Sequence, residues 1–134
     1  MEFLGYRRTD GTVGVRNLVA LIPAGRCANE MACRIADEAG TGVHPVLHNQ
    51  PCVHVGPDNE AARRVLTGIG CNPNVAGAIV VGVGCDGIPA DPIADGIARS
   101  NKPVELVTIE REGSYENAAA KGVRAAKQMM ADAS

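Results

Sequence analysis

The sequence predicts an α/β fold with a single, doubly wound, mostly parallel sheet of four strands, of the flavodoxin-like type, and an N-terminal hairpin arm. Short apolar runs alternate with amphipathic segments four times along the chain, which is typical of βα units joined by right-handed crossovers. The length of 134 residues and the hydrophobic content of 46% fit one domain that buries a core without disulfide or metal support.

The first two βα units follow directly after the arm. Residues 18–24 form a continuous apolar run, typical of a strand buried on both faces, and the helix that follows ends at Gly40. A second strand at residues 43–48 leads through a loop to a helix with Asp58 as its N-cap. The stripe of this helix that is expected to be buried comprises Ala61, Ala62, Val65, Leu66 and Ile69.

The last two units complete the predicted sheet. A strand at residues 76–83 is followed by Asp91 and Pro92, an N-cap with proline at the first helical position. A strand at residues 104–109 precedes an Ala-rich helix, for which Ser114 is the expected cap. All four predicted strands are therefore followed by a helix.

The N-terminal segment does not continue this pattern, so residues 18–134 form the α/β domain and residues 1–17 form an arm or hairpin. Asp10-Gly11 suits a tight turn between two short strands. The arm carries Arg7, Arg8 and Arg16. These arginines could clamp a carboxylate bidentately, or they could form a solvated basic arm that pairs with acids on the sheet.

Composition excludes several classes of protein. A net charge of −2 and only three aromatic residues argue against a nucleic-acid-binding surface. The longest apolar stretch is too short to span a bilayer, and the N-terminus lacks the order of a signal peptide, so we expect a cytoplasmic protein. The five cysteines are odd in number and contain no C-x-x-C, so we expect thiols and not a disulfide framework or zinc ribbon.

Polar side chains follow each predicted strand, at the edge where open α/β sheets bind ligands. In chain order they are Arg26, Cys27, His48, Asn49, Cys52, His54, Cys85, Asp86, Glu110, Arg111 and Glu112. Thiols, an imidazole and a carboxylate on neighbouring loops could bind a soft divalent metal such as Fe(II) or Zn(II). Because the loop from residue 49 to residue 57 is longer than a usual βα connection, we expect it to be functional; the alternative is an irregular surface loop.

Two motifs leave alternatives open. Cys27 opens a helix, where the helix dipole favours a reactive thiolate, but a buried thiol at a strand end would look the same in sequence. Residues 82–87 match G-x-G-x-x-G, but Pro89 and Pro92 delay the helix that a dinucleotide-binding fingerprint needs. We therefore expect no nucleotide cofactor.

Three segments give the chain a resemblance to a known family. They are GYRRTDGTVGVRN in the arm, Cys27-Ala28 at the start of a helix, and NPNVAGAIVVGVGCD around the third strand. Together they resemble the altronate and galactarate dehydratase family, which also includes the sulfolactate sulfo-lyase large subunit. The chain looks like the central α/β domain of that family, whose members are longer and carry a further large C-terminal region.

The resemblance implies a lyase that removes water, or sulfite, from a hydroxy acid with the help of a divalent metal, which we expect to be Fe(II). It implies metal ligands at Cys27, Cys52, Cys85 and Asp86. Substrate carboxylate binding falls to Arg7, Arg8, Arg16 and Asn17. His48 or His54 suits the general acid, because an imidazole titrates near neutral pH.

We therefore expect a domain or subunit of a metal-dependent lyase that dehydrates a sugar acid of the altronate or galactarate kind. Its expected partners are the hydroxy-acid substrate, a possible separate subunit with the C-terminal region, and a second copy, since homodimers are the commonest oligomers. The alternative is a non-catalytic module of the same family that binds a ligand or assembles subunits.

Overall fold

A four-stranded parallel sheet in the order β4-β3-β5-β6 forms the centre of the computed structural model, which describes residues 1–50, 57–84 and 87–133. Its strands are β3 (Leu18–Pro23), β4 (Val43–Pro45), β5 (Val75–Gly82) and β6 (Val104–Thr108). The chain runs from β3 to β4 on one side and then to β5 on the other side, with every pairing parallel. The predicted fold class is confirmed.

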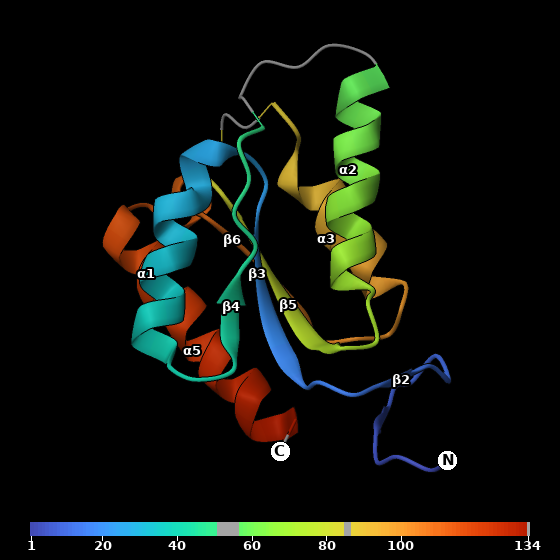
Figure 1. Cartoon of the computed structure of the whole chain (residues 1–134). Coiled ribbons are helices and arrows are strands. Elements are labelled where there is room, and N and C mark those ends of the chain that lie inside the picture. Colours follow the sequence, from blue (N-terminus) through green and yellow to red (C-terminus); the bar gives the residue numbers. More distant parts are fainter. Residues whose placement is uncertain (51–56, 85–86, 134) are drawn as a thin grey trace.

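Helices cover both faces of the sheet (Figure 1). One face packs on α1 (Asn29–Ala39), which follows the 3-10 turn η1 (Arg26–Ala28), and on α5 (Tyr115–Ala133). The other face packs on α2 (Pro57–Gly70) and α3 (Ala90–Ala98). Within β3, Leu21 joins the first core and Ile22 joins the second. Burying each such side chain contributes roughly 1.5–3 kcal/mol, so the two cores fix the sheet between its helices.

The arm is a small antiparallel hairpin of β1 (Tyr6–Arg7) and β2 (Val13–Gly14), outside the four-stranded sheet. At its turn, Gly11 has a φ of 88°, a conformation that glycine adopts without strain, and Asp10 Oδ1 accepts a hydrogen bond of 3.0 Å from the Thr12 amide. The predicted turn is confirmed. The hairpin lies beside the amino ends of the strands, near the last turn of α5 (Figure 1).

Helix starts differ from the predictions at two places. Helix α2 begins at Pro57, so Asp58 lies in its first turn and is not its cap. Helix α3 begins at Ala90 after Pro89, whose extended backbone (ψ 136°) serves as the N-cap, so the predicted cap Asp91 is wrong as well. By contrast, Ser114 Oγ accepts a hydrogen bond of 3.1 Å from the Asn117 amide, which confirms its capping role.

Other boundaries shift by a few residues. Strand β4 ends at Pro45, three residues earlier than predicted, although the Val46 amide still donates to Leu21 O at 2.8 Å. A short helix that the sequence analysis missed, α4 (Ile109–Glu112), follows β6 because Thr108 Oγ1 accepts a hydrogen bond from the Arg111 amide. Within the described residues, no helix is long and apolar enough to cross a membrane.

The predicted buried stripe of α2 is confirmed in part, since Ala62 and Ile69 are half-buried and pack on the second core. Leu66 is buried, but Val65 is 61% exposed and Ala61 is also exposed. The exposed side of the stripe lines a groove between α2 and the segment at residues 46–50 that follows the edge strand β4. This helix therefore has an apolar flank that the rest of the described structure leaves uncovered.

Candidate functional site

The carboxyl ends of β3 and β5 flank the point where the order of the strands reverses, which is the usual ligand site of such sheets. The segment at residues 46–50 is fastened there to the turn between β3 and α1. The Arg26 amide donates to Gln50 O at 3.0 Å, and Asn29 Nδ2 donates to His48 O at 2.8 Å. These bonds hold the start of the long loop at the predicted site edge.

Both ring nitrogens of His48 are engaged by the main chain. Its Nε2 lies 2.7 Å from Pro23 O, and its Nδ1 accepts a hydrogen bond of 3.2 Å from the Gln50 amide. This pattern requires the neutral tautomer with the proton on Nε2. These hydrogen bonds make His48 a structural link between β3 and the 46–50 segment. Its predicted catalytic role would require the imidazole to break them. His54, the other predicted catalytic histidine, lies outside the described residues.

Of the four predicted metal ligands, the described residues include Cys27, which is exposed in η1 after the end of β3. Cys52, Cys85 and Asp86 lie outside the described residues. Within residues 1–50, 57–84 and 87–133, no three His, Cys, Asp or Glu side chains come together. The described residues therefore do not by themselves make a metal site.

Two residues after Cys27, the side chain of Asn29 carries an oxygen whose hydrogen-bond acceptor capacity is unused among the described residues. Its Oδ1 is buried, and no hydrogen-bond partner for it exists among the described residues. A buried amide oxygen without a partner is costly. This oxygen is therefore a position where a ligand could supply the missing contact.

A second hollow at the same edge lies beyond β5 and β6. It measures about 170 Å³ and includes Gly84, Glu110 and Thr108 in its lining. Gly84 has a φ of 122°, and a Cβ there would lie 2.7 Å from Glu110 Cβ, so the Glu110 side chain lies directly over this glycine. Arg111 Nη2 donates to Asp91 Oδ2 at 2.7 Å, which lowers the pKa of that carboxyl below its ordinary value.

The predicted substrate-binding arginines lie at the opposite, amino edge of the sheet. Arg8 donates from Nε to Pro73 O at 2.7 Å, from Nη1 to Asn17 Oδ1 at 2.9 Å and from Nη2 to Arg16 O at 2.8 Å. Asn17 Nδ2 in turn donates to Ala133 O. Arg8 and Asn17 thus fasten the arm to the loop before β5 and to the end of α5.

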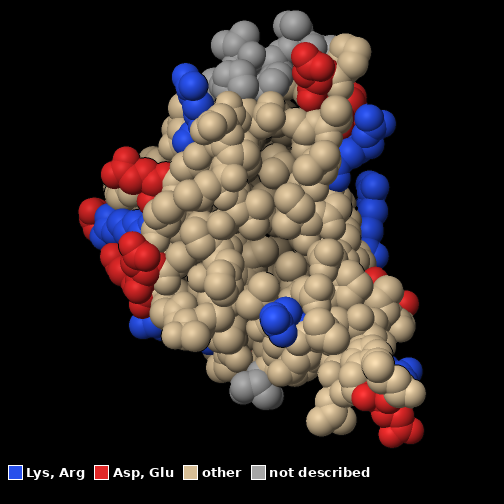
Figure 2. Space-filling view, in the orientation of Figure 1, with Lys and Arg blue, Asp and Glu red and all other residues tan. Residues whose placement is uncertain are grey.

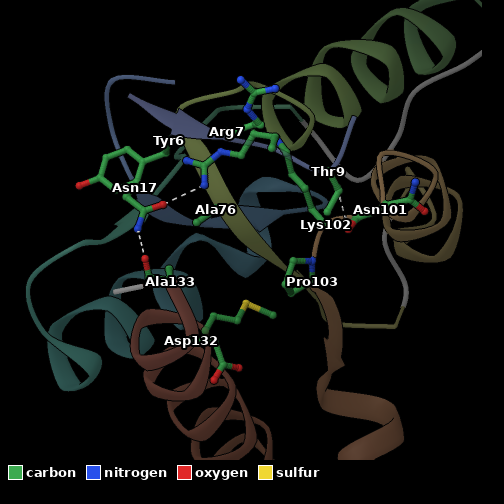
Figure 3. A pocket seen from close by; sticks show the side chains of 12 residues that line it. Tyr6, Arg7, Thr9, Asn17, Ala76, Asn101, Lys102, Pro103, Asp132 and Ala133 are labelled. Atoms are coloured by element: carbon green, nitrogen blue, oxygen red, sulfur yellow. Dashed lines mark hydrogen bonds between the residues drawn. The ribbon is translucent and has the colours of Figure 1, made fainter. Parts of the chain in front are cut away.

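The Arg7 and Asn17 side chains lie around a cavity (Figure 3), whose volume is about 300 Å³. Arg7, Arg8 and Asn17 line it together with Lys102, which the sequence analysis did not single out. Lys102 is only 7% exposed, and its Nζ donates to the Gly70 and Asn72 carbonyls at the end of α2. Burial lowers the pKa of this ammonium group. The sequence did offer a signal for Lys102, because it lies two residues before β6 and so at the amino edge of the sheet.

The two edges cannot serve one small substrate in the same copy of the chain. Strand β5 runs between them over 8 residues, which is roughly 25 Å at the rise of a parallel strand. The structure therefore brings Cys27 and His48 to one edge, and Arg7, Arg8 and Asn17 to the other. Arg16, exposed beside Arg8, belongs to the amino edge as well. The predicted carboxylate clamp stays a prediction.

An open, doubly wound sheet with polar side chains at its strand reversal is an arrangement typical of α/β domains that bind small molecules. Residues 5–134 match the family model described as "D-galactarate dehydratase/Altronate hydrolase, second domain". The chain belongs to this family, as its motifs predicted. The family match covers the arm as well as the sheet and its helices.

Two curated relatives show the range of the family. The chain is 38% identical over 132 residues to (2R)-sulfolactate sulfo-lyase subunit beta of Chromohalobacter salexigens, a match that covers 98% of this chain and 33% of the relative. It is 31% identical over 84 residues to altronate dehydratase of Bacillus subtilis, covering 56% of this chain and 17% of the relative. The chain thus spans a third or less of the curated relatives it matches. No solved structure matches it significantly.

Proposed function

We propose that this chain is a domain of a metal-dependent lyase that dehydrates a sugar acid or a related hydroxy acid and works together with a further region of the family. The family match over residues 5–134, with relatives named as a dehydratase and a sulfo-lyase, carries the proposal. The reaction would take place at the carboxyl edge of the sheet, where Cys27 and the 46–50 segment lie.

The proposal includes a divalent metal, Fe(II), held by Cys27 together with Cys52, Cys85 and Asp86. A divalent metal at a hydroxy acid would polarise the carboxylate and favour loss of the neighbouring proton. Between the two candidate general acids we favour His54, because His48 already uses both ring nitrogens on the main chain. Self-association of the chain, expected from base rates alone, stays a prediction.

Metal analysis tests the proposed ligand set. The chain is purified without oxygen in the presence of Fe(II), and the metal content per chain is measured in the wild type, in Cys27→Ala and in Cys71→Ala. Cys71 is the matched control because it is half-buried just after α2, where its Sγ points to Gly96 O. We expect near-stoichiometric metal in the wild type and the control, and loss of metal in Cys27→Ala. Equal metal content in the two variants would exclude Cys27 as a ligand.

Activity is tested in the longer context that the family supplies. In a chimera, this chain replaces the matching third of the sulfo-lyase subunit beta, and elimination is assayed with altronate, galactarate and (2R)-sulfolactate. A folded, metal-loaded chimera that acts on none of these hydroxy acids would overturn the lyase proposal. The alternative, a module that binds a ligand or assembles subunits without catalysis, would then be the better reading.

A further inference from the structure

The apolar groove beside α2 is a feature that the described residues leave uncovered and that the proposed function does not use. It measures about 490 Å³ and lies between α2 and the 46–50 segment. Its exposed apolar side chains include Leu47, which is 51% exposed, and Val65, which is 61% exposed. Val46, Ala61 and Ile69 continue the apolar lining. Apolar surface of this kind usually marks a contact with another protein surface.

The face that contains this groove carries few charges. Figure 2 shows a broad area of uncharged side chains between β4 and α2, with Lys, Arg, Asp and Glu gathered mainly along its margins. Among the described residues that line the groove, Asp58 and His48 are the acidic or basic side chains. Depletion of charge at the centre with charge at the rim is the usual composition of a protein interface.

The neighbouring strand edge is closed to strand addition. Gly42 O and the Val46 amide both bond to β3, and Pro45, which lies between them on β4, has no amide hydrogen to offer. A proline at an edge strand blocks pairing with another strand. A partner on this face must therefore pack side chains into the groove and not extend the sheet.

The comparisons indicate which partner this is. The matching family model is described as a second domain, so chains of the family carry domains beside this one. The matched 132 residues make up 33% of the sulfo-lyase subunit beta. The other two-thirds of that relative lie outside the matched region and could contact the matched domain. The groove also continues into the proposed site, because His48 and Gln50 line the groove and are bonded to the end of β3 and to the turn after it.

We propose that the groove between α2 and residues 46–50 docks the neighbouring domain of the family's longer chains, which would insert apolar side chains between Leu47 and Val65. A domain seated there borders the carboxyl edge and closes one side of the proposed reaction site. The inference rests on the proposed function for this last point only, since the docking itself requires no catalysis.

The experiment compares one substitution in two contexts. Val65→Glu is introduced into the isolated chain and into the chimera in which this chain replaces the matching third of the sulfo-lyase subunit beta. Val15→Glu on the arm is the control, since Val15 is 53% exposed and lies away from the groove. Thermal unfolding of all variants is followed by calorimetry.

We expect Val65→Glu to leave the melting temperature of the isolated chain nearly unchanged and to lower that of the chimera by at least about 3 °C, or to split its transition in two. Val15→Glu should do neither.

An unchanged melting temperature of the Val65→Glu chimera, or equal sensitivity at both positions, overturns the proposal. So does an isolated chain that sediments as a dimer in the wild type and as a monomer in Val65→Glu, because a second copy would then occupy the groove. A chimera that unfolds as expected but lacks lyase activity overturns the proposed function alone.

Discussion

The two edges of the sheet both collect polar side chains, but they use them differently. At the amino edge, Arg8 and Lys102 donate to main-chain carbonyls of residues 70–73, and the Val15 and Arg16 amides donate to Asn74 Oδ1. At the carboxyl edge, Cys27 is exposed and the buried Asn29 Oδ1 lacks a partner among the described residues. Hydrogen bonds from Arg8 and to Asn74 therefore hold the arm at the amino edge, whereas the carboxyl edge leaves the Asn29 oxygen open to a ligand.

The largest expected effect tests whether hydrogen bonds at the amino edge hold the arm in place. Arg8→Ala removes three hydrogen bonds of a charged donor and leaves Pro73 O without its partner, which we expect to lower the free energy of unfolding by about 3 kcal/mol. Arg7→Ala, an equal change at an exposed neighbour, should cost less than about 0.5 kcal/mol. Urea unfolding measures both. Similar costs for the two variants would mean that Arg8 does not hold the arm.

The second-largest expected effect tests the hydrogen bonds of His48 at the carboxyl edge. His48→Ala removes hydrogen bonds to Pro23 O and to the Gln50 amide, so we expect a loss of about 1–2 kcal/mol in the free energy of unfolding. His44 on β4 is exposed and serves as the matched control, for which His44→Ala should change stability by less than about 0.5 kcal/mol. Chemical unfolding at neutral pH checks the pair. If His48→Ala proves as mild as the control, His48 is available for chemistry and its predicted catalytic role regains support.

Sequence patterns predicted the sheet well because β3 and β5 are continuous apolar runs whose burial leaves little choice of structure. They failed where a polar side chain had two possible partners. Asp91 suits a helix cap, but its carboxylate pairs with Arg111 from the short helix α4, and Pro89 is the N-cap of α3. The stripe of α2 failed only at Ala61 and Val65, and for another reason, since periodicity shows an apolar flank but not whether the same chain covers all of it.

The position of the arm, by contrast, was available from the sequence. Asn17 directly precedes β3, Asn74 directly precedes β5, and Lys102 stands two residues before β6. Residues that precede parallel strands gather at the amino edge, as surely as those that follow strands gather at the carboxyl edge. The sequence therefore indicates that the arm and Lys102 meet far from Cys27. The hydrogen-bond acceptors of the arm could not be predicted, because most of them are main-chain carbonyls, which every residue has.

A smaller effect concerns Lys102 and pH. Because burial lowers the pKa of Lys102 in the folded chain, the unfolded chain binds more protons as the pH approaches 10.5, and stability contributed through this group rises with pH. The wild type should gain stability relative to Lys102→Met between pH 7 and pH 10. Lys127→Met, at an exposed position on α5, is the control and should show no such trend. A constant difference between wild type and Lys102→Met across this range would mean that burial does not shift the titration of Lys102.

The smallest expected effect is at the carboxyl edge, in the ion pair between Asp91 and Arg111. Both side chains are more than half exposed, so water and salt screen their attraction, and Asp91→Asn should leave the melting temperature at neutral pH nearly unchanged. Since Arg111 lowers the pKa of Asp91, any stabilisation exists above the ordinary value of 3.8 and disappears as the pH falls through the lower, folded value. Wild type and Asp91→Asn should therefore converge in acid. A large loss at neutral pH that salt does not reduce would show that the carboxyl edge is fastened as firmly as the amino edge, and the contrast between the two edges would fail.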